Sequence, residues 1–209
     1  MIPILPATGE NVELAAARLR AGDLVAFPTE TVYGLGANAL EQTTLAKIFE
    51  VKRRPFFDPL IVHIADTEWA DRLCMRIPPQ ARILMRRFWP GPLTLVLPKT
   101  GRVPDLATSG LPGVALRMPA HPVALALIRA AGFPLAAPSA NPFGRLSPTT
   151  ATHVQGHFAE GIACILDGGP CPIGVESTVI SFLEEVPALL RAGGLPREEV
   201  ESAIGPLAV

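Results

Sequence analysis

Residues 23–36 read DLVAFPTETVYGLG. The first five predict a short buried strand that Pro28 ends, because proline cannot continue a central strand ladder. The loop that follows, residues 28–36, has two glycines and many polar side chains. Loops after central strands are where open α/β sheets bind ligands. We therefore expect one wall of a small-molecule site here rather than an ordinary connection, with polar side chains from Thr29, Glu30, Thr31 and Tyr33.

Helical and strand patterns alternate along the rest of the chain. Helices are predicted over residues 11–21, 41–52, 79–88, 121–131 and 197–204, and another begins over 149–155 behind the cap pattern Ser147-Pro148. Strands are predicted over 60–64, 93–97, 114–118, 134–137, 164–166, 177–182 and 188–191. Several strand pairs have no helix between them, which indicates a mixed sheet. Because neither a repeat nor a change of composition interrupts the chain, we expect a single α/β domain over residues 1–209, with its core at about 12–204.

The bulk composition excludes several classes of protein. The chain has 209 residues, is 49% hydrophobic and has a formal net charge of −1, so no overall field draws it to nucleic acid or anionic lipid. Its three cysteines cannot all pair and show no C-x-x-C spacing, which favours reduced thiols. No apolar run approaches the roughly 18 residues of a membrane span, and the first residues lack the pattern of a signal peptide. We therefore expect a cytoplasmic protein without a membrane partner.

Four familiar motifs fail. Residues 34–39 match G-x-G-x-x-A, but six residues separate Phe27 from the first glycine, which in a dinucleotide fingerprint follows the strand directly. His153 and His157 are four apart, but Val154 stands where a zinc helix needs glutamate, so we expect surface histidines. Neither a P-loop nor a G-x-S-x-G elbow occurs. No resident metal is predicted.

Cations and hydroxyl groups gather at the ends of the predicted elements. Lys52-Arg53-Arg54-Pro55 ends a helix, which is typical of a solvated C-terminus, but a loop with Asp58 and a strand ending in His63 follow at once and favour polyphosphate binding. Arg117 and Arg191 end apolar strands; a buried arginine needs an anionic partner, which a structural carboxylate or a substrate could equally supply. Few acid–base candidates accompany them, so the set fits phosphoryl or nucleotidyl transfer. Ser139, Asn141, Ser147, Ser177 and Thr178 add polar groups, each of which alone would be a cap or turn residue.

Motifs spread over residues 12–204 carry a family resemblance. In order they are PTETVYGLGANA, K-x-R-P at 52–55, PLIVHI, FWPGPLTLVL, VALRMPAHP, AAPSAN, SPT, and GVESTVI followed by LLRAGG. Together they closely resemble the YrdC-like family, the threonylcarbamoyl-AMP synthases. The resemblance implies a twisted open α/β sheet with a large concave, positively charged cavity. It also implies a reaction that joins L-threonine, bicarbonate and ATP into threonylcarbamoyl-AMP and pyrophosphate, for the modification of tRNA.

The resemblance further implies substrate-binding roles for thirteen residues. Around threonine it places Thr31, His63, Arg117, Ser177 and the backbone of Ala137. At the nucleotide it places the catalytic pair Lys52 and Arg54, with Ser139, Asn141, Ser147, Arg191, Asp58 and the backbone of Gly113. Tyr33 would pack at the cavity wall. Magnesium would accompany the triphosphate, with no tightly bound metal and no protein nucleophile.

The chain departs from the family pattern in three places. Arg53 stands where the family often has glycine. Asp58 stands where it often has asparagine, and an acid there would assist ATP only through magnesium or an arginine. The linker and second domain of longer members do not follow the final helix, so the single-domain type is expected.

Two alternatives stay open beside the synthase. One is a carbamoyl-transfer paralogue, and the other is an RNA-binding module of the same fold. The net charge of −1 and the 6% aromatic content speak against a module that only binds RNA. Besides the substrates, the expected partners are the proteins that transfer threonylcarbamoyl to tRNA, with contact to tRNA or double-stranded RNA as a further option.

Overall fold

The computed structural model describes residues 1–208, so Val209, the last residue of the expected domain, lies outside them. Its strands are β1 (Ile4–Pro6), β2 (Val25–Phe27), β3 (Gly34–Asn38), β4 (Ile61–His63), β5 (Leu93–Pro98), β6 (Gly113–Arg117), β7 (Leu135–Ala136), β8 (Cys164–Asp167), β9 (Thr178–Ser181) and β10 (Ala188–Arg191). Its helices are α1 (Gly9–Arg20), α2 (Gln42–Lys52), α3 (Glu68–Leu73), α4 (Pro79–Phe88), α5 (Asp105–Thr108), α6 (Pro122–Ala131), α7 (Ala151–His157) and α8 (Arg197–Ile204).

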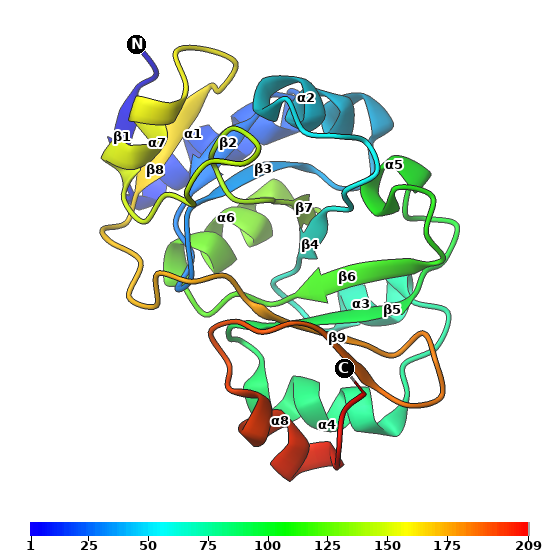
Figure 1. Cartoon of the computed structure of the whole chain (residues 1–209). Helices are drawn as coiled ribbons and strands as arrows, with labels where there is room; N and C mark the ends of the chain where they lie inside the picture. The colour runs from blue at the N-terminus through cyan, green and yellow to red at the C-terminus, as the bar shows by residue number, and fades with distance from the viewer. Residues whose placement is uncertain (209) are drawn as a thin grey trace.

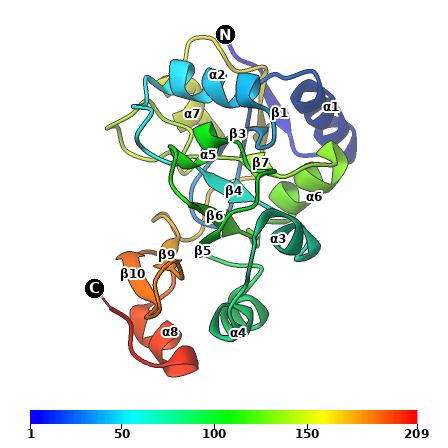
Figure 2. The ribbon, with the colours of Figure 1, turned by 90° about the vertical axis from the view of Figure 1, so that its right-hand side faces the viewer.

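The strands form one mixed sheet, as predicted. Over residues 1–208 it has ten strands in the order β1-β8-β2-β3-β7-β4-β6-β5-β9-β10 (Figure 1). Strands β4 and β6 pair in parallel, as do β5 and β9, whereas β2 and β3 form an antiparallel pair. Figure 2 shows α1, α3 and α6 on one side of the sheet, with α4 and α8 side by side at one end of the molecule. No helix of the described chain is both long and apolar enough to cross a membrane.

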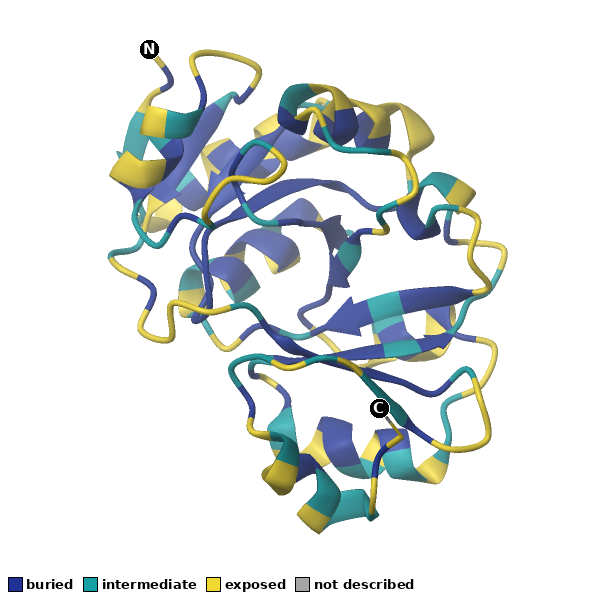
Figure 3. Ribbon diagram, viewed as in Figure 1, coloured by how far each residue is buried: buried dark blue, intermediate teal, exposed yellow. Residues whose placement is uncertain are grey.

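The core consists of two apolar clusters. The larger one joins α2 and α4 to the middle of the sheet through side chains such as Ile48, Val62 and Leu84. The smaller one packs α1 and α6 against β2 and β8 and includes the buried side chains of Leu19 and Leu127. Figure 3 shows the central strands as almost wholly buried. Each large apolar side chain removed from water contributes about 1.5–3 kcal/mol, so the clusters fix the sheet that positions the strand ends.

Local sequence explains where the helices begin and end. The hydroxyl oxygen of Thr8 accepts a hydrogen bond from the backbone N–H of Asn11 (3.3 Å) and caps α1, which ends before Gly22, a residue with φ of +83°. Pro122 opens α6, and Gly132 ends it in the left-handed region.

Other predicted boundaries were wrong. The last three residues of the expected loop, 34–36, lie in β3, because the small residues of GLGAN pack against β2 and are fully buried. The Ser147-Pro148 pattern does not cap α7; Thr150 does, through a bond from the N–H of His153 (3.2 Å). The short elements β1, α3 and α5 were not predicted, because three to six residues show no clear periodicity.

The backbone conformation of Arg53 explains why glycine suits the position directly after α2. The residue is exposed and adopts φ 51° and ψ 39°, a left-handed conformation in which a Cβ costs about 1–2 kcal/mol. We expect Arg53→Gly to raise stability by about 1 kcal/mol, less the entropy that glycine loses on folding, and hence to raise Tm by about 2–4 °C. Thermal unfolding measures this, with Arg53→Ala as the control that keeps the strain. An unchanged or lower Tm for the glycine variant would contradict the prediction.

Candidate active site

A cavity of about 420 Å³ opens where the ends of several central strands meet. Its walls come from the loop between β2 and β3, the end of α2 with the loop after it, β4, β6, the loop of residues 137–147 and the start of β9. Segments far apart in the sequence therefore meet at one site. Twelve of the thirteen predicted site residues line it: Thr31, Lys52, Arg54, Asp58, His63, Arg117, Ala137, Ser139, Asn141, Ser147, Ser177 and Arg191.

Two predicted positions lie elsewhere. Gly113, at the start of β6, is absent from the lining; a Cβ there would stand 2.8 Å from the side chain of Leu183 and 2.9 Å from that of Val96. Tyr33 does not pack at the cavity wall as expected. Its ring is fully buried, and its hydroxyl donates to the carbonyl of Gly169 (2.8 Å), which ties its loop to the segment after β8. Burial raises the pKa of this phenol.

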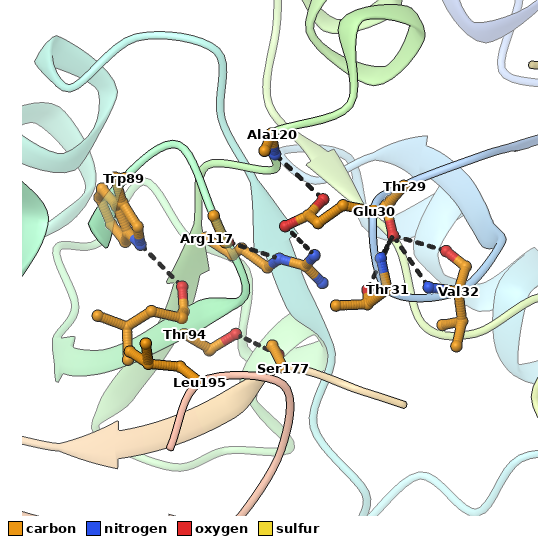
Figure 4. A network of polar contacts seen from close by, with 12 residues as sticks. Thr29, Glu30, Thr31, Val32, Trp89, Thr94, Arg117, Ala120, Ser177 and Leu195 are labelled. Atoms are coloured by element: carbon orange, nitrogen blue, oxygen red, sulfur yellow. Dashed lines mark hydrogen bonds and ion pairs between the residues drawn. The ribbon is translucent and has the colours of Figure 1, made fainter. Parts of the chain in front are cut away.

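The loop of residues 29–32 is closed by its own hydrogen bonds (Figure 4). The hydroxyl oxygen of Thr29 accepts the backbone N–H groups of Thr31 (3.1 Å) and Val32 (3.2 Å), and lies 2.8 Å from the hydroxyl oxygen of Thr31. From outside, Ile173 and Gly174 donate backbone N–H groups to the carbonyls of Glu30 and Thr31 (3.0 Å each). Thr31 therefore faces the cavity from a backbone held on both sides.

Arg117 has a structural carboxylate partner, as one of the two readings of this buried arginine required. Its Nη2 donates to Oε1 of Glu30 (2.7 Å), and its Nε donates to the carbonyl of Gly91 (3.3 Å). Both charged side chains are buried, at 4% exposure for Arg117 and 10% for Glu30. Because Arg117 also lines the cavity, a substrate anion would meet a guanidinium that is already paired.

His63 is a neutral group in this site. Burial lowers its pKa to about 3, and the charge of Arg117 adds to the effect. Its Nδ1 lies 3.3 Å from the carbonyl oxygen of Ile61, and its ring packs edge-on against Phe27. His63 can therefore exchange hydrogen bonds with a ligand near pH 7 but brings no charge.

Ser177 is held by two neighbours. Its hydroxyl oxygen lies 2.8 Å from that of Thr94, a fully buried residue of β5. Arg191 reaches it from β10, because Nη2 of Arg191 donates to the Ser177 carbonyl (2.9 Å) and to its hydroxyl oxygen (3.2 Å). The same arginine forms an ion pair with Glu176, whose other oxygen accepts the hydroxyl of Ser147 (3.1 Å).

Lys52 is almost wholly buried, at 1% exposure. Its ammonium group donates to the backbone carbonyls of Ser139 and Asn141, and its own carbonyl accepts the N–H of Phe143 (2.8 Å). Burial lowers its pKa to about 7, and the nearby charge of Arg54 adds to the effect. Lys52 thus joins the end of α2 to the loop of residues 139–147 and leaves one ammonium donor over.

Arg54 and Asp58 form an i,i+4 ion pair with Nη2 and Oδ2 2.9 Å apart. Arg54 also donates to the backbone carbonyls of Asp58 (3.1 Å) and Pro59 (2.9 Å), which shapes the loop after α2. Asp58 therefore contacts Arg54 through both its carboxylate and its backbone carbonyl. The side chain of Asn141 likewise holds a loop, through donation to the carbonyl of Arg145 (2.6 Å).

Sequence reasoning missed two charged residues of the lining, Glu176 and Arg145. Glu176 stands inside the quoted GVESTVI motif, and the need of Arg191 for a carboxylate partner could have pointed to it. The lining as a whole carries five Lys or Arg side chains and two carboxylates. Among residues 1–208, no group of three or more His, Cys, Asp or Glu side chains is placed to hold a metal.

The chain is similar to known proteins over nearly its whole length. The model of the Sua5_yciO_yrdC family, described as "Telomere recombination", matches residues 17–193. Two relatives named threonylcarbamoyl-AMP synthase, from Pyrococcus abyssi and Bacillus subtilis, are 56% and 54% identical over 95% of this chain, which spans 58% of each relative. A crystal structure of P. abyssi Sua5 complexed with L-threonine superposes with a TM-score of 0.95 at 54% identity, over 99% of this chain and 61% of that one.

Proposed function

The chain belongs to the Sua5/YciO/YrdC family, and we propose that its cavity joins L-threonine, bicarbonate and ATP into threonylcarbamoyl-AMP with release of pyrophosphate. One observation carries the proposal: a single cavity contains both the residues expected around threonine and the cations expected around phosphate. The relatives' names and the threonine in the P. abyssi structure support it. The chain spans 58% of the relatives' length, so the proposed activity rests on the residues of this cavity.

The reaction has two stages. First bicarbonate releases hydroxide to give carbon dioxide. The amine of threonine attacks the carbon of carbon dioxide, and the proton that the amine loses combines with the hydroxide to give water, which leaves a carbamate. A carbamate oxygen then attacks the α-phosphorus of ATP, and the bond from that phosphorus to the β-phosphate oxygen breaks to release pyrophosphate. Lys52, Arg54 and Arg191 neutralise the charge that builds on phosphate oxygens, and Arg117 holds a carboxylate or carbamate. No covalent enzyme intermediate is needed.

Magnesium would arrive with the triphosphate and supply further charge neutralisation. The cavity offers oxygen donors that suit this hard cation, the carboxylates of Asp58 and Glu176. Both carboxylates are already paired with arginines, so the magnesium would take its ligands mainly from phosphate and water.

The test is an assay of pyrophosphate release from ATP. We expect release with threonine and bicarbonate together, much less with serine, and none without an amino acid. Release that does not depend on an amino acid would contradict the proposal. Binding of RNA that persists in variants of Lys52 and Arg54, without this activity, would favour the RNA-binding module.

The wider role follows from the product. A mixed anhydride of a carbamate and a phosphate is labile, so we expect proteins that transfer threonylcarbamoyl to tRNA to consume it, in the cytoplasm. The three cysteines, all free and buried, suit a reducing compartment. Residues 1–209 would form one domain of the YrdC type.

Asp58 should weaken ATP binding, because its carboxylate competes with phosphate for Arg54. We expect Asp58→Asn to lower the KM for ATP about threefold to tenfold, in line with about 1 kcal/mol for a partly exposed ion pair. Arg54 keeps its bonds to the backbone carbonyls of residues 58 and 59, so it stays in place. Steady-state kinetics measures the change. Asp71→Asn, which breaks the pair with Arg82 on α4 outside the cavity, is the control, and an equal or higher KM for Asp58→Asn would contradict the prediction.

A further inference from the structure

Glu30 stands directly behind the wall of the cavity. Its carboxylate is buried, and the residue is not part of the cavity lining. Oε1 accepts a hydrogen bond from Nη2 of Arg117 (2.7 Å), and Oε2 accepts the backbone N–H of Ala120 (3.1 Å). Figure 4 shows the carboxylate between these two donors. Glu30 therefore clamps the loop after β2 to the chain that leaves β6.

The clamp fixes the plane of the Arg117 guanidinium. A guanidinium has five N–H donors in one rigid fork. One donates to Glu30 and a second, on Nε, to the carbonyl of Gly91 (3.3 Å). Two bonds to different atoms of a planar group define its orientation. Nη1 donates to no residue within 1–208, and Arg117 lines the cavity, so these donors are open to a ligand.

The carboxylate of Glu30 balances the positive charge of Arg117. Burial lowers the pKa of this guanidinium and the carboxylate of Glu30 raises it, while Arg191 adds positive charge nearby. His63 beside it is neutral. Removing a carboxylate from a buried ion pair leaves an uncompensated charge. Glu30 thus sets both the charge and the direction of the group that faces the ligand.

We propose that Glu30 is the positioning residue for threonine binding: it holds Arg117 so that Nη1 meets the carboxylate of the amino acid. The proposal rests on the proposed function, since it takes threonine as the ligand. Glu30 touches no substrate and acts only through Arg117. Its loss should therefore affect threonine far more than ATP.

The test is Glu30→Gln. Glutamine keeps the size, but its amide group must point a donor at either Arg117 or the N–H of Ala120, so one of the two bonds is lost. We expect the Kd for threonine in calorimetric titration without ATP, and the KM for threonine in pyrophosphate release, to rise at least tenfold. The KM for ATP should change less than twofold. A general loss of structure would not separate the two substrates in this way.

Glu201→Gln is the matched control. The carboxylate of Glu201 also joins an arginine, Arg197 (2.7 Å), to a backbone N–H, that of Leu207 (3.1 Å), but outside the cavity. Its threonine constants should stay at wild-type values. If Glu30→Gln does not fold, Glu30→Asp takes its place: the shorter acid keeps the charge but cannot span both donors, so the KM for threonine should rise threefold or more.

The outcomes separate the two proposals. If the wild-type chain binds no threonine, the proposed function fails. If the wild-type chain binds threonine and the Glu30 variants bind it equally well, the positioning role is overturned while the proposed function stands. Equal losses for threonine and ATP would also overturn it, because they would indicate a structural role.

Discussion

Lys52→Met is expected to lower pyrophosphate release by about 10³-fold while the chain still folds. The ammonium of Lys52 is buried at the cavity wall, where a fixed charge acts strongly on a phosphate group, and removal of one such group commonly costs 10²–10³-fold in rate. Methionine fills the same space, although the carbonyls of Ser139 and Asn141 lose their donor. The rate is measured at saturating threonine, with thermal unfolding in parallel.

Lys47→Met is the control for this variant. Lys47 lies on the same helix, α2, and its ammonium also donates to a backbone carbonyl, that of Gly22 (2.6 Å), but it does not line the active-site cavity. Its activity should match the wild type. A Lys52→Met enzyme with more than a tenth of wild-type activity would remove Lys52 from the mechanism.

The pKa of Lys52 gives the same variant a second readout. The amine titrates at about 7 in the folded chain and near 10.5 in the unfolded chain, so between these values the unfolded chain binds the extra proton. The free energy of unfolding of the wild type should therefore increase as pH rises from 7 to 10 and decrease as pH falls over the same range. Lys52→Met should lack this slope in denaturant unfolding.

Arg54→Ala is expected to lower pyrophosphate release by about 10²-fold. The guanidinium lies in the loop directly after α2 and lines the cavity, and alanine removes its charge from the phosphate groups. The variant should fold, because the lost bonds hold only the loop to Asp58 and Pro59. Pyrophosphate release and Tm are measured together.

Two further variants serve as controls for the activity of Arg54→Ala. Arg53→Ala removes the neighbouring exposed arginine and should leave the rate unchanged. Arg54→Lys keeps the charge without the planar fork, so it should recover part of the activity. Wild-type turnover by Arg54→Ala would show that phosphate is held by other groups.

Much of the fold follows from local sequence. The helices α4 and α8 and the strand β10 lie at the predicted residues, and α4 begins with a proline at its first helical position. The strand β3 was hidden by its glycines, which usually mark turns. It forms because Gly36 lets the ring of Phe27 approach within 2.8 Å of where a Cβ would stand.

Most of the polar residues that line the cavity were named from the sequence, but their ion pairs were not. Motif order predicted twelve of the residues that line one cavity. It did not show that Arg54, Arg117 and Arg191 each have a carboxylate partner, Asp58, Glu30 and Glu176 respectively. Glu30 and Arg117 are 87 residues apart, and no local pattern relates two positions at that separation.

In the loop of residues 28–36, the sequence determined some features and only the tertiary structure determined the others. Its proline, glycines and polar side chains by themselves determined that a buried strand ends there and that polar groups face a site. Only the tertiary structure decided that Thr31 faces the cavity, that Tyr33 turns away to Gly169, and that Glu30 stands behind Arg117. The reason is physical: backbone propensity acts over a few residues, whereas the partner of a buried charge is chosen by the packing of strands that are distant in the chain.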